Sequence, residues 1–500
     1  MIRKANLQTL IENSCRSPYK QKTGDVSYSE ETGFHIYGEL RLNMKLTAAE
    51  DVEDARKYLK ILETYANIAD ICSKDIGASL LEVQGERIHL LFPCPTADRD
   101  NIIKIIRFSV ALVNHVYDKI KELAGKDYQG FAMATDHGRS ILLNNGNGAN
   151  SSIISLGPSA NAPAKRLGKE QDGSVKTPAG HLAIRSKYME NIGTPARIKE
   201  WVNIDLLNIS EKTPDYIDRE MGQRFTNLLR EGLIDSSGTR RIVFVESSRM
   251  PEDFNFDFSG IAYKTTAFFM RADLDGFTKE VENAFENGAI DKLIAKFLDI
   301  MNYPKRFSEG CGRRIIELPW AGDCANLIPF TKIGEGFHQA QTYLPTLLPA
   351  EWHGQATSYK VIDESWTKAM GNVKWAVSFS GGDSDDGMPV ILVATIKTSQ
   401  RDFLVASGWS VGKSLDALEA DGVNGDDTVI ANEDYGYLDS EYQDLFRELD
   451  SRFKISRNLT KNKIRDASIA ATGSKAQVQV SNKSILVPSP RPHWSFYGTD

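Results

Sequence analysis

TTAFFMRADLDGFT, the sequence at positions 265–278, is an apolar run that leads into a short acidic turn. Its β-branched and aromatic residues predict a buried strand. Gly276 and the aspartates before it predict a tight turn, and a helix is expected to begin near Phe277. Asp273 is therefore expected where the strand ends, close to a helix N-terminus.

A second acidic turn lies further along the chain, in IIELPWAGDCANLI at positions 315–328. Two short apolar runs are joined there by Ala321-Gly322-Asp323, which is typical of a β-hairpin. Either aspartate taken alone would pass for an ordinary turn residue. Two carboxylates at neighbouring strand ends are costly unless a cation lies between them, and Mg²⁺ or Mn²⁺ holding a polyphosphate is the usual occupant. The pair predicts a two-metal phosphoryl-transfer site.

The bulk composition limits the kind of protein that carries this pair. A chain of 500 residues is too long for one hydrophobic core, so two or three domains are expected. Hydrophobic residues make up 41% and charged residues 25%, as in ordinary soluble globular proteins. The net charge of −7 gives no electrostatic footprint for nucleic acid or for an anionic membrane surface. We therefore expect neither a nucleic-acid partner nor a membrane partner.

The five cysteines are scattered without CxxC spacing, and the eight histidines form no ligand pair such as HxxxH. This pattern fits a reducing compartment and excludes a thiolate zinc site. No apolar run approaches the ~18–20 residues of a membrane span, and the N-terminus lacks the apolar region of a signal peptide. We expect a cytoplasmic protein.

The order strand–helix–hairpin–helix–hairpin–helix occurs twice along the chain, which predicts an internal duplication of one α+β unit. We place the first copy at residues 31–205 and the second, which carries both aspartates, at residues 256–455. We expect residues 1–30 to form an N-terminal arm, residues 206–255 a helical linker and residues 456–500 a C-terminal tail.

The first copy lacks the acidic pair. Where the second copy has Asp273, the first offers residues 36–39 and no aspartate. Its hairpin has Glu86 in place of Asp323. We therefore expect that the first copy does not bind the metal ions.

The second copy lacks a feature that stands near the end of the first. Asn161 and Lys165 are one turn apart, on one face of a predicted helix, and the matching positions of the second copy hold Gly412 and Asp416. An amide and a cation can orient a ribose and stabilise charge on a phosphoryl group, whereas a glycine and an aspartate cannot. One composite site between the two copies would use both halves.

These motifs resemble those of the class III nucleotidyl cyclases, the adenylate and guanylate cyclases. The metal motif of that family, F-x-D-(I/L)-x-G-F-T followed by a later G-D, is similar to the segments that end at Thr278 and Asp323. The partner unit of the family carries G-x-x-x-N-x-x-x-R, which is similar to residues 157–165, with Lys165 in place of the arginine and Arg166 next to it. The resemblance covers roughly residues 30–450. It implies an α+β protein of two tandem ferredoxin-like, palm-type units packed head-to-tail, with the active site at their interface.

The same resemblance implies roles for individual residues. Two Mn²⁺ or Mg²⁺ ions would be held by Asp273, Leu274 and Asp323. The residues implied to contact the nucleotide are Glu82, Ile154, Asp275, Gly276, Phe277, Thr278 and Lys199.

The composite site also implies catalytic residues on the first copy. Asn161 would hold the ribose, and either Lys165 or Arg166 would stabilise the negative charge of the transition state. The ribose 3′-oxygen would attack the α-phosphorus and expel pyrophosphate.

A shorter resemblance narrows the family. Ala160-Asn-Ala-Pro-Ala-Lys165 is similar to the A-N-x-A-A-K motif of the bacterial Pycsar anti-phage pyrimidine cyclases, and Thr135-Asp-His-Gly138 resembles their D-H-G segment. It implies an enzyme that makes cCMP or cUMP as the second messenger of an antiviral defence system. It also implies a separate effector that responds to the cyclic nucleotide.

The resemblance to the class III cyclases implies that the substrate base contacts Glu82 and Ile154, because the base-reading positions of that family lie three residues before the glycines that correspond to Gly85 and Gly157. Adenylate cyclases place Lys and Asp at these positions, so ATP is disfavoured. A glutamate accepts a hydrogen bond from the amino group of cytosine, whereas uracil has an acceptor at that edge. CTP is therefore the favoured substrate, with UTP and then GTP as alternatives.

Three functions stay open at this point. The first is a cytidylate cyclase, a phosphorus–oxygen lyase, and the second is a uridylate or guanylate cyclase. The third is a non-catalytic cyclase homologue that senses a nucleotide. For each we expect either a monomer with an internal pseudo-dimer or a homodimer.

Overall fold

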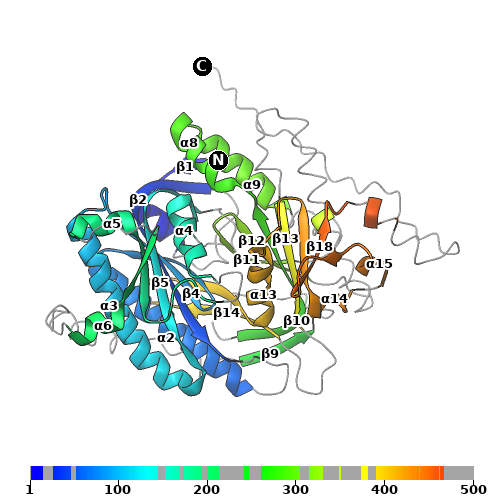
Figure 1. The fold of residues 1–500 in the computed structure, drawn as a ribbon, viewed down its shortest axis with the longest axis horizontal. Helices are drawn as coiled ribbons and strands as arrows, with labels where there is room; N and C mark the ends of the chain where they lie inside the picture. The colour runs from blue at the N-terminus through cyan, green and yellow to red at the C-terminus, as the bar shows by residue number, and fades with distance from the viewer. Residues whose placement is uncertain are drawn as a thin grey trace.

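The computed structural model describes residues 2–14, 26–44, 46, 52–144, 153–168, 174–193, 200–212, 241–246, 261–303, 315–329, 348–350, 373–380, 390–438, 440–460, 462–464 and 466. These residues form two mixed β-sheets with helices packed on them (Figure 1). Most of the linker and of the C-terminal tail expected from the sequence lies outside the described residues.

The first sheet contains strands from residues 2–205 only. Its main path is β3 (Ser79–Gln84), β4 (Arg87–Pro93), β2 (Val26–Leu42), β5 (Tyr128–Asn144), β7 (His181–Arg185) and β8 (Trp201–Asp205). Two further strands join it, β1 (Ile2–Lys4) beside β2 and β6 (Ile153–Leu156) beside β5. Residues 2–4, which the sequence placed in an arm, thus pair with the start of β2.

Alternation along β2 gives the first sheet two different faces. Phe34, Ile36 and Leu40 point into the hydrophobic core, because successive side chains of a strand lie on opposite faces. His35 and Glu39 take the intervening positions on the other face. On this second face Tyr37 packs in a smaller buried cluster with Ala132, Ala134, Leu167 and Ala183.

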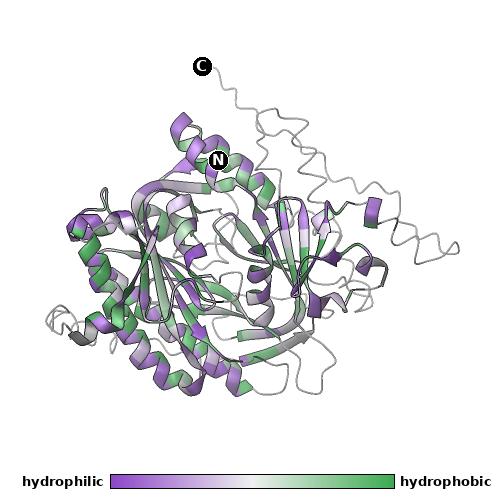
Figure 2. Ribbon diagram, in the orientation of Figure 1, coloured by the Kyte–Doolittle hydropathy of each residue, from purple (hydrophilic) through white to green (hydrophobic). Residues whose placement is uncertain are grey.

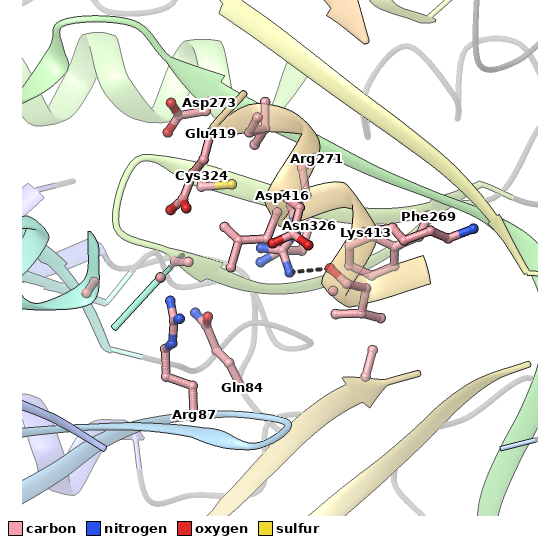
Figure 3. Close-up of a pocket in the computed structure, with 18 of the residues that line it drawn as sticks. Gln84, Arg87, Phe269, Arg271, Asp273, Cys324, Asn326, Lys413, Asp416 and Glu419 are labelled. Atoms are coloured by element: carbon pink, nitrogen blue, oxygen red, sulfur yellow. Dashed lines mark hydrogen bonds between the residues drawn. The ribbon is translucent and has the colours of Figure 1, made fainter. Parts of the chain in front are cut away.

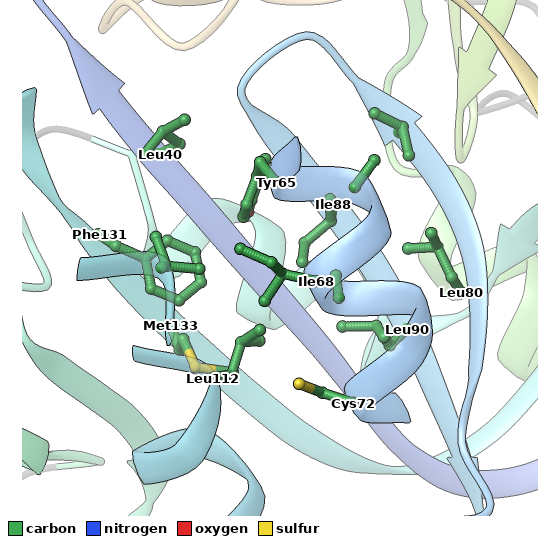
Figure 4. Close-up of a cluster of buried hydrophobic side chains, with 14 of the residues drawn as sticks. Leu40, Tyr65, Ile68, Cys72, Leu80, Ile88, Leu90, Leu112, Phe131 and Met133 are labelled. Carbon is green, nitrogen blue, oxygen red and sulfur yellow. The ribbon is translucent and has the colours of Figure 1, made fainter. Parts of the chain in front are cut away.

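Two long helices, α2 (Val52–Ile76) and α3 (Arg99–Ala124), cover the apolar face of the first sheet (Figure 1). Both carry hydrophilic and hydrophobic residues, as Figure 2 shows, because one side of each helix faces solvent. Asp98 caps α3 by accepting a hydrogen bond from the main-chain N–H of Asn101. Figure 4 shows Tyr65 and Ile68 of α2 packed among strand residues such as Leu90 and Phe131. Fully burying one such side chain contributes about 2 kcal/mol.

The second sheet repeats the order of the first with residues 241–457. Its main path is β11 (Ile315–Ala321), β12 (Cys324–Pro329), β10 (Ile261–Leu274), β13 (Val373–Ser380), β16 (Asp427–Ala431), β18 (Phe453–Arg457) and β17 (Arg447–Glu448). The strands off this path are β9 (Arg241–Glu246), β14 (Ile391–Lys397) and β15 (Asp402–Ser407). Helices α8 (Phe277–Asn287) and α9 (Ile290–Met301) pack on the apolar face.

The two strand orders show the duplication directly. In each unit a hairpin pairs with a long strand, and a short strand runs parallel to the beginning of that strand. The prediction of an α+β protein with two tandem units is confirmed. The remaining described helices are short: α1 (Leu7–Ser14), α4 (Pro158–Arg166), α5 (Ser186–Met189), α6 (Leu206–Lys212), α13 (Trp409–Leu418), α14 (Asn432–Tyr435) and α15 (Ser440–Gln443). No helix in the described part of the chain is long and apolar enough to cross a membrane.

Each unit completes the core of the other. The end of β5 and strand β6 extend the first sheet towards the second unit, where Ile141 and Leu156 pack in the core beneath α8 and α9. In return, Leu392 of β14 and Val405 of β15 pack in the core beneath α2 and α3. Arg401, between β14 and β15, donates a 2.9 Å hydrogen bond to the carbonyl of Leu80. The units are therefore packed head-to-tail, with α4 and α13 between the two sheets (Figure 1).

Candidate active site

A cavity of about 1440 Å³ lies between the two units and is lined by residues of both. The second unit contributes the end of β10, the β11–β12 hairpin, the start of α8 and one face of α13. The first unit contributes the β3–β4 hairpin, the end of β2 and α4. Figure 3 shows Gln84 and Arg87 extending from the β3–β4 hairpin towards Arg271, Asp416 and Glu419.

Asp273 and Asp323 line this cavity from neighbouring strands. Asp273 of β10 pairs with Cys324 of β12. Asp323 is the residue directly before Cys324, so the two aspartates lie at neighbouring positions of adjacent strands. Gly322 makes the turn between β11 and β12 with a φ of 62°, a conformation that favours glycine. A Cβ atom at Gly322 would also lie 3.2 Å from Oδ1 of Asn161, so the turn and α4 are in close contact.

The pKa values of both carboxyl groups are raised. Burial and the negative charge of Asp273 raise the pKa of Asp323 to about 8. Burial also raises the pKa of Asp273, although Lys374 and Lys165 oppose the change. A bound cation would favour the ionised form of both carboxyl groups and so lower their pKa values. The chemistry of the site therefore fits a divalent metal ion.

Lys374 of β13 forms an ion pair with Asp273. Its Nζ lies 3.2 Å from Oδ2 of Asp273, and the two residues are register partners on adjacent strands. Burial opposes the charged form of Lys374, but the carboxylate of Asp273 outweighs this effect and raises the Lys374 pKa. The sequence did not single out this residue.

Asn161 of the first unit reaches the acidic pair of the second. Its Nδ2 donates a 2.9 Å hydrogen bond to Oγ1 of Thr278 and lies 3.5 Å from Oδ1 of Asp323. Helix α4 begins after Gly157, whose φ is 143°, and Pro158 occupies its first turn. The first turn of α4 thus carries Asn161 across the interface between the units.

Lys165 and Arg166 are separated by their positions on α4. Lys165 lies one turn after Asn161 and lines the cavity, where its charge opposes the rise in the pKa values of both aspartates. Arg166 does not line the cavity and donates a 2.9 Å hydrogen bond to the carbonyl of Lys176. The geometry thus favours Lys165 as the cation of the site.

The acidic turn and the start of α8 complete this end of the cavity. Gly276 has a φ of 77°, and Phe277 packs against Phe297 with their ring centroids 5.0 Å apart. Asp275 accepts a 3.2 Å hydrogen bond from the main-chain N–H of Gly425. The anchored ring and this bond hold the helix N-terminus in place, where main-chain N–H groups are available for phosphate oxygens.

The residues expected to read the base are not in the cavity lining. Ile154 is 0% exposed and packs in the core beneath α8 and α9, because its side of β6 faces that core. Glu82 is 4% exposed and lies behind Gln84, whose Nε2 donates a hydrogen bond to it. Gln84, two residues after Glu82 on β3, does line the cavity. Lys199, the remaining expected contact, lies outside the described residues.

The buried carboxyl of Glu82 predicts a pH-dependent stability. Burial raises the pKa of Glu82 from 4.5 to about 8. The folded protein therefore holds this proton more tightly than the unfolded chain, and the resulting stabilisation is present at acidic pH and lost as the pH rises through the folded pKa. We expect the Tm of the wild type to fall, relative to that of Glu82→Gln, between about pH 5 and pH 9. Scanning fluorimetry across this range checks it, and parallel curves for the two proteins would contradict it.

Arg271 is a further charged residue of the cavity. It stands two residues before Asp273 on β10 and shares its face of the sheet. Its Nε donates a 2.7 Å hydrogen bond to Oγ of Ser414, and a terminal nitrogen donates a 3.2 Å bond to the carbonyl of Val411. Burial lowers the pKa of Arg271. These bonds join α13 to the strand that carries Asp273.

The first sheet contains a counterpart of the acidic pair. Asp273 pairs with the residue that follows Asp323, and Glu39 pairs in the same way with Arg87, the residue that follows Glu86. Glu39 and Glu86 therefore stand where the second unit has its two aspartates. The alignment by sequence placed residues 36–39 at this position, and the strand register selects Glu39 among them.

Other side chains of the protein bind both glutamates. Arg87 lies 2.7 Å from Oε1 of Glu39, and Arg41 lies 3.6 Å from Oε2. The hydroxyl of Tyr58 donates a hydrogen bond to Glu86. Guanidinium and hydroxyl groups thus contact both glutamates, and we keep the second unit as the candidate metal site.

No protein-family model and no curated protein matches the chain. Among solved structures, the chain is similar to a class III adenylyl cyclase-like ATP-binding protein from Pseudomonas aeruginosa, with a TM-score of 0.68 and 16% sequence identity over 94% of this chain and 95% of that one. The adenylyl cyclase CyaB from P. aeruginosa aligns with 39% of this chain and 93% of its own at a TM-score of 0.28 and 14% identity. The guanylyl cyclase Cya2 aligns with 35% of this chain and 90% of its own at a TM-score of 0.26 and 19% identity. The first similarity confirms the predicted class III cyclase-like fold.

Proposed function

We propose that the protein is a nucleotidyl cyclase that converts a pyrimidine nucleoside triphosphate, CTP above all, to its 3′,5′-cyclic monophosphate and pyrophosphate. The observation that carries the proposal is the hydrogen bond from Asn161 of the first unit to Thr278 of the second, beside Asp323. It joins an amide suited to a ribose with an acidic pair suited to a metal–polyphosphate in one cavity.

The acidic pair supports two Mg²⁺ or Mn²⁺ ions. Among the described residues no group of three or more His, Cys, Asp or Glu side chains is arranged to hold a metal. Two carboxylates are sufficient for these ions, because Mg²⁺ is commonly bound by one or two carboxylates together with water and substrate phosphates. Asp273 and Asp323 would hold the ions, with the main-chain carbonyl of Leu274. When bound, the ions would lower the pKa of the ribose 3′-hydroxyl and neutralise the phosphates.

The residues of the chain then orient the substrate and stabilise charge. Asn161 holds the ribose so that its 3′-oxygen faces the α-phosphorus. As the bond from phosphorus to pyrophosphate breaks, Lys165 stabilises the negative charge on the phosphoryl oxygens. The N–H groups of residues 274–278, at the start of α8, bind the phosphates.

The base assignment now depends on Gln84. Its Nε2 is bonded to Glu82, which leaves Oε1 as the end of the amide that accepts a hydrogen bond. The amino group of cytosine is a matching donor, whereas uracil presents an acceptor at that edge. We therefore place CTP first, UTP second and GTP third.

A nucleotide panel tests the proposal. The purified protein is incubated with Mn²⁺ and either CTP, UTP, GTP or ATP, and the cyclic product and pyrophosphate are measured by mass spectrometry and a coupled assay. We expect cCMP with equimolar pyrophosphate as the main product. Turnover restricted to ATP would contradict the base assignment while leaving the reaction class intact.

A second candidate is a nucleotide-binding protein without cyclase activity. Two observations favour it: Lys374 already pairs with Asp273, and the P. aeruginosa protein of similar fold is described as ATP-binding. This candidate predicts that calorimetry detects nucleotide binding while no pyrophosphate is released from any of the four nucleotides.

The biological role follows from the Pycsar-like segment at residues 160–165. We propose that the cyclic nucleotide is the messenger of an anti-phage defence system in the cytoplasm, read by a separate effector. In this proposal the base- and ribose-binding unit is residues 31–205 and the metal-binding unit is residues 256–455.

A further inference from the structure

Helix α8, which begins at the acidic turn, contacts the first unit at two points along one of its faces. In its first turn Thr278 accepts the hydrogen bond from Asn161. Phe285 stands seven residues later, so it lies two turns along the same face, ~10 Å away along the helix axis. The guanidinium of Arg139 lies over the ring of Phe285, 4.3 Å from its centroid. Two contacts at this separation set the direction of the helix as well as its position.

Arg139 follows Gly138 on β5, and the alternation of the strand directs these two residues to opposite faces of the first sheet. Ile141 shares the face of Arg139 and is buried in the core beneath α8 and α9. On the other face, a Cβ atom at Gly138 would lie 3.1 Å from Cβ of Ser159, in the first turn of α4. The hydroxyl of Ser159 donates a 3.2 Å hydrogen bond to the carbonyl of Arg139. These two residues therefore contact both helices that carry residues of the site.

Arg139 directly follows the segment Thr135-Asp-His-Gly138, to which the proposed reaction gives no role. Asp136 of this segment accepts a 2.7 Å hydrogen bond from the hydroxyl of Tyr188. It also lies 3.1 Å from Nε of Arg185 in an ion pair. These bonds fix β5 to α5 and to the end of β7. The strand is thus anchored immediately before the two residues that contact α4 and α8.

The second unit has no arginine at the corresponding position. His137 of β5 and Phe379 of β13 occupy equivalent places in the pairing of their strands with β2 and β10, so Arg139 corresponds to Gly381. Gly381 lies outside the described residues, but a glycine has no side chain with which to make such a contact. The arginine therefore belongs to the unit whose α4 carries Asn161.

We propose that Arg139 is a positioning residue of the cyclase reaction. Its carbonyl binds the start of α4 and its guanidinium binds α8, so that Asn161 stays in register with the main-chain N–H groups at the start of α8. The inference rests on the proposed function. Arg139 does not line the cavity, so it acts through the two helices and not by contact with the nucleotide. Its side chain is 57% exposed and lies 3.6 Å from Glu30, so it can be changed without opening the core.

A double-mutant cycle tests the proposal. The wild type, Arg139→Ala, Phe285→Leu and the double variant are assayed for kcat and KM with Mn²⁺ and the nucleotide, out of CTP, UTP, GTP and ATP, that the wild type converts fastest. We expect each single variant to lower kcat about 10-fold with little change in KM, because a small misplacement of the reacting groups slows the chemical step. The double variant should lose no more than the single variants, since all three remove the same contact.

Two further variants sharpen the comparison. Arg139→Lys should recover part of the loss, because an ammonium group also binds an aromatic face. Arg99→Ala is the matched control, an exposed arginine at the start of α3 that does not line the cavity, and it should keep the wild-type kcat. A melting curve for each variant identifies any loss that is due to unfolding. If Phe285→Leu fails to fold, the comparison of Arg139→Ala with Arg139→Lys and Arg99→Ala still decides the result.

Hydrogen–deuterium exchange of the α8 amides adds a readout that needs no turnover. Residues 277–287 should exchange faster in Arg139→Ala than in the wild type and in Arg99→Ala. A wild-type kcat for Arg139→Ala, additive losses in the cycle, or unchanged exchange of α8 would each refute the positioning role while the cyclase activity of the wild type stands. A wild type that converts none of the four nucleotides would refute the proposed function, and the positioning role with it.

Discussion

Asp273→Ala is expected to lower the cyclase turnover number by about 1000-fold or more, because the loss of a metal-binding carboxylate removes several kcal/mol of transition-state stabilisation. The fold should be retained. Burial raises the pKa of Asp273 and the charge of Asp273 raises that of Asp323, so removing the side chain relieves a repulsion. We expect the metal-free variant to melt close to the wild-type temperature, because the relieved repulsion offsets the loss of the ion pair with Lys374.

The measurement is initial-rate formation of the cyclic nucleotide together with a melting curve in EDTA. Asp273→Asn provides a second variant that keeps the size of the side chain. The matched control is Glu39→Gln, which changes the corresponding position of the first unit and should leave turnover close to wild type. Full activity of Asp273→Ala would remove the basis of the metal assignment.

The second large effect concerns the cation of the site. Lys165→Met should lower turnover by about 100- to 1000-fold, the range seen when one preorganised donor to a developing charge is removed. Arg166→Met should lose far less activity, because Arg166 is bonded to the carbonyl of Lys176 and does not line the cavity. Lys165→Arg should recover part of the loss, since the family motif has an arginine at this position.

The comparison of Lys165 and Arg166 is made at saturating metal over a range of nucleotide concentrations, so that kcat and KM are separated. A loss confined to KM would mean that Lys165 binds substrate and transition state equally. A larger loss for Arg166→Met than for Lys165→Met would require α4 to rotate in the working enzyme, and would contradict the site described above.

The sequence was sufficient to predict the fold and the main partners in the cavity. The apolar run before Asp273, the hairpin at Gly322 and the helical spacing of Asn161 and Lys165 are all local patterns, and local patterns are what periodicity reports. The duplication supplied the long-range information, because two copies of one unit imply a pair of related interfaces. The structure accordingly places Asn161 beside Asp323.

The contacts that the sequence did not predict depend on which residues of neighbouring strands pair with each other. The sequence around a single residue does not specify this pairing. Lys374 meets Asp273 only through the pairing of β10 with β13, and Glu39 meets Arg87 only through the pairing of β2 with β4. One signal for Lys374 was present: it is a lone cation in an otherwise apolar strand. A buried charge of this kind commonly has a partner on the neighbouring strand.

Two further departures have their own causes. Arg271 stands where the family motif has a phenylalanine, and this mismatch was the sign of a charged residue in the cavity wall. Ile154 was assigned to the base pocket by counting back from Gly157, but β6 turns that side chain into the core of the other unit. The exchange of strands between the cores is a tertiary effect that counting along the chain does not capture.

In a symmetric homodimer every position serves in both halves of the interface at once, so a change that suits one half is imposed on the other. Tandem fusion removes this constraint. Glu39 can pair with guanidinium groups while its counterpart Asp273 serves the proposed metal site. In the same way, the position of α13 that corresponds to Asn161 can hold Gly412. The interlocked cores allow no such freedom, since Leu392 and Ile141 each stabilise the unit to which they do not belong. Because one chain carries both halves, the residues that line the cavity can differ between the two units, while the residues that build the shared cores are kept in both.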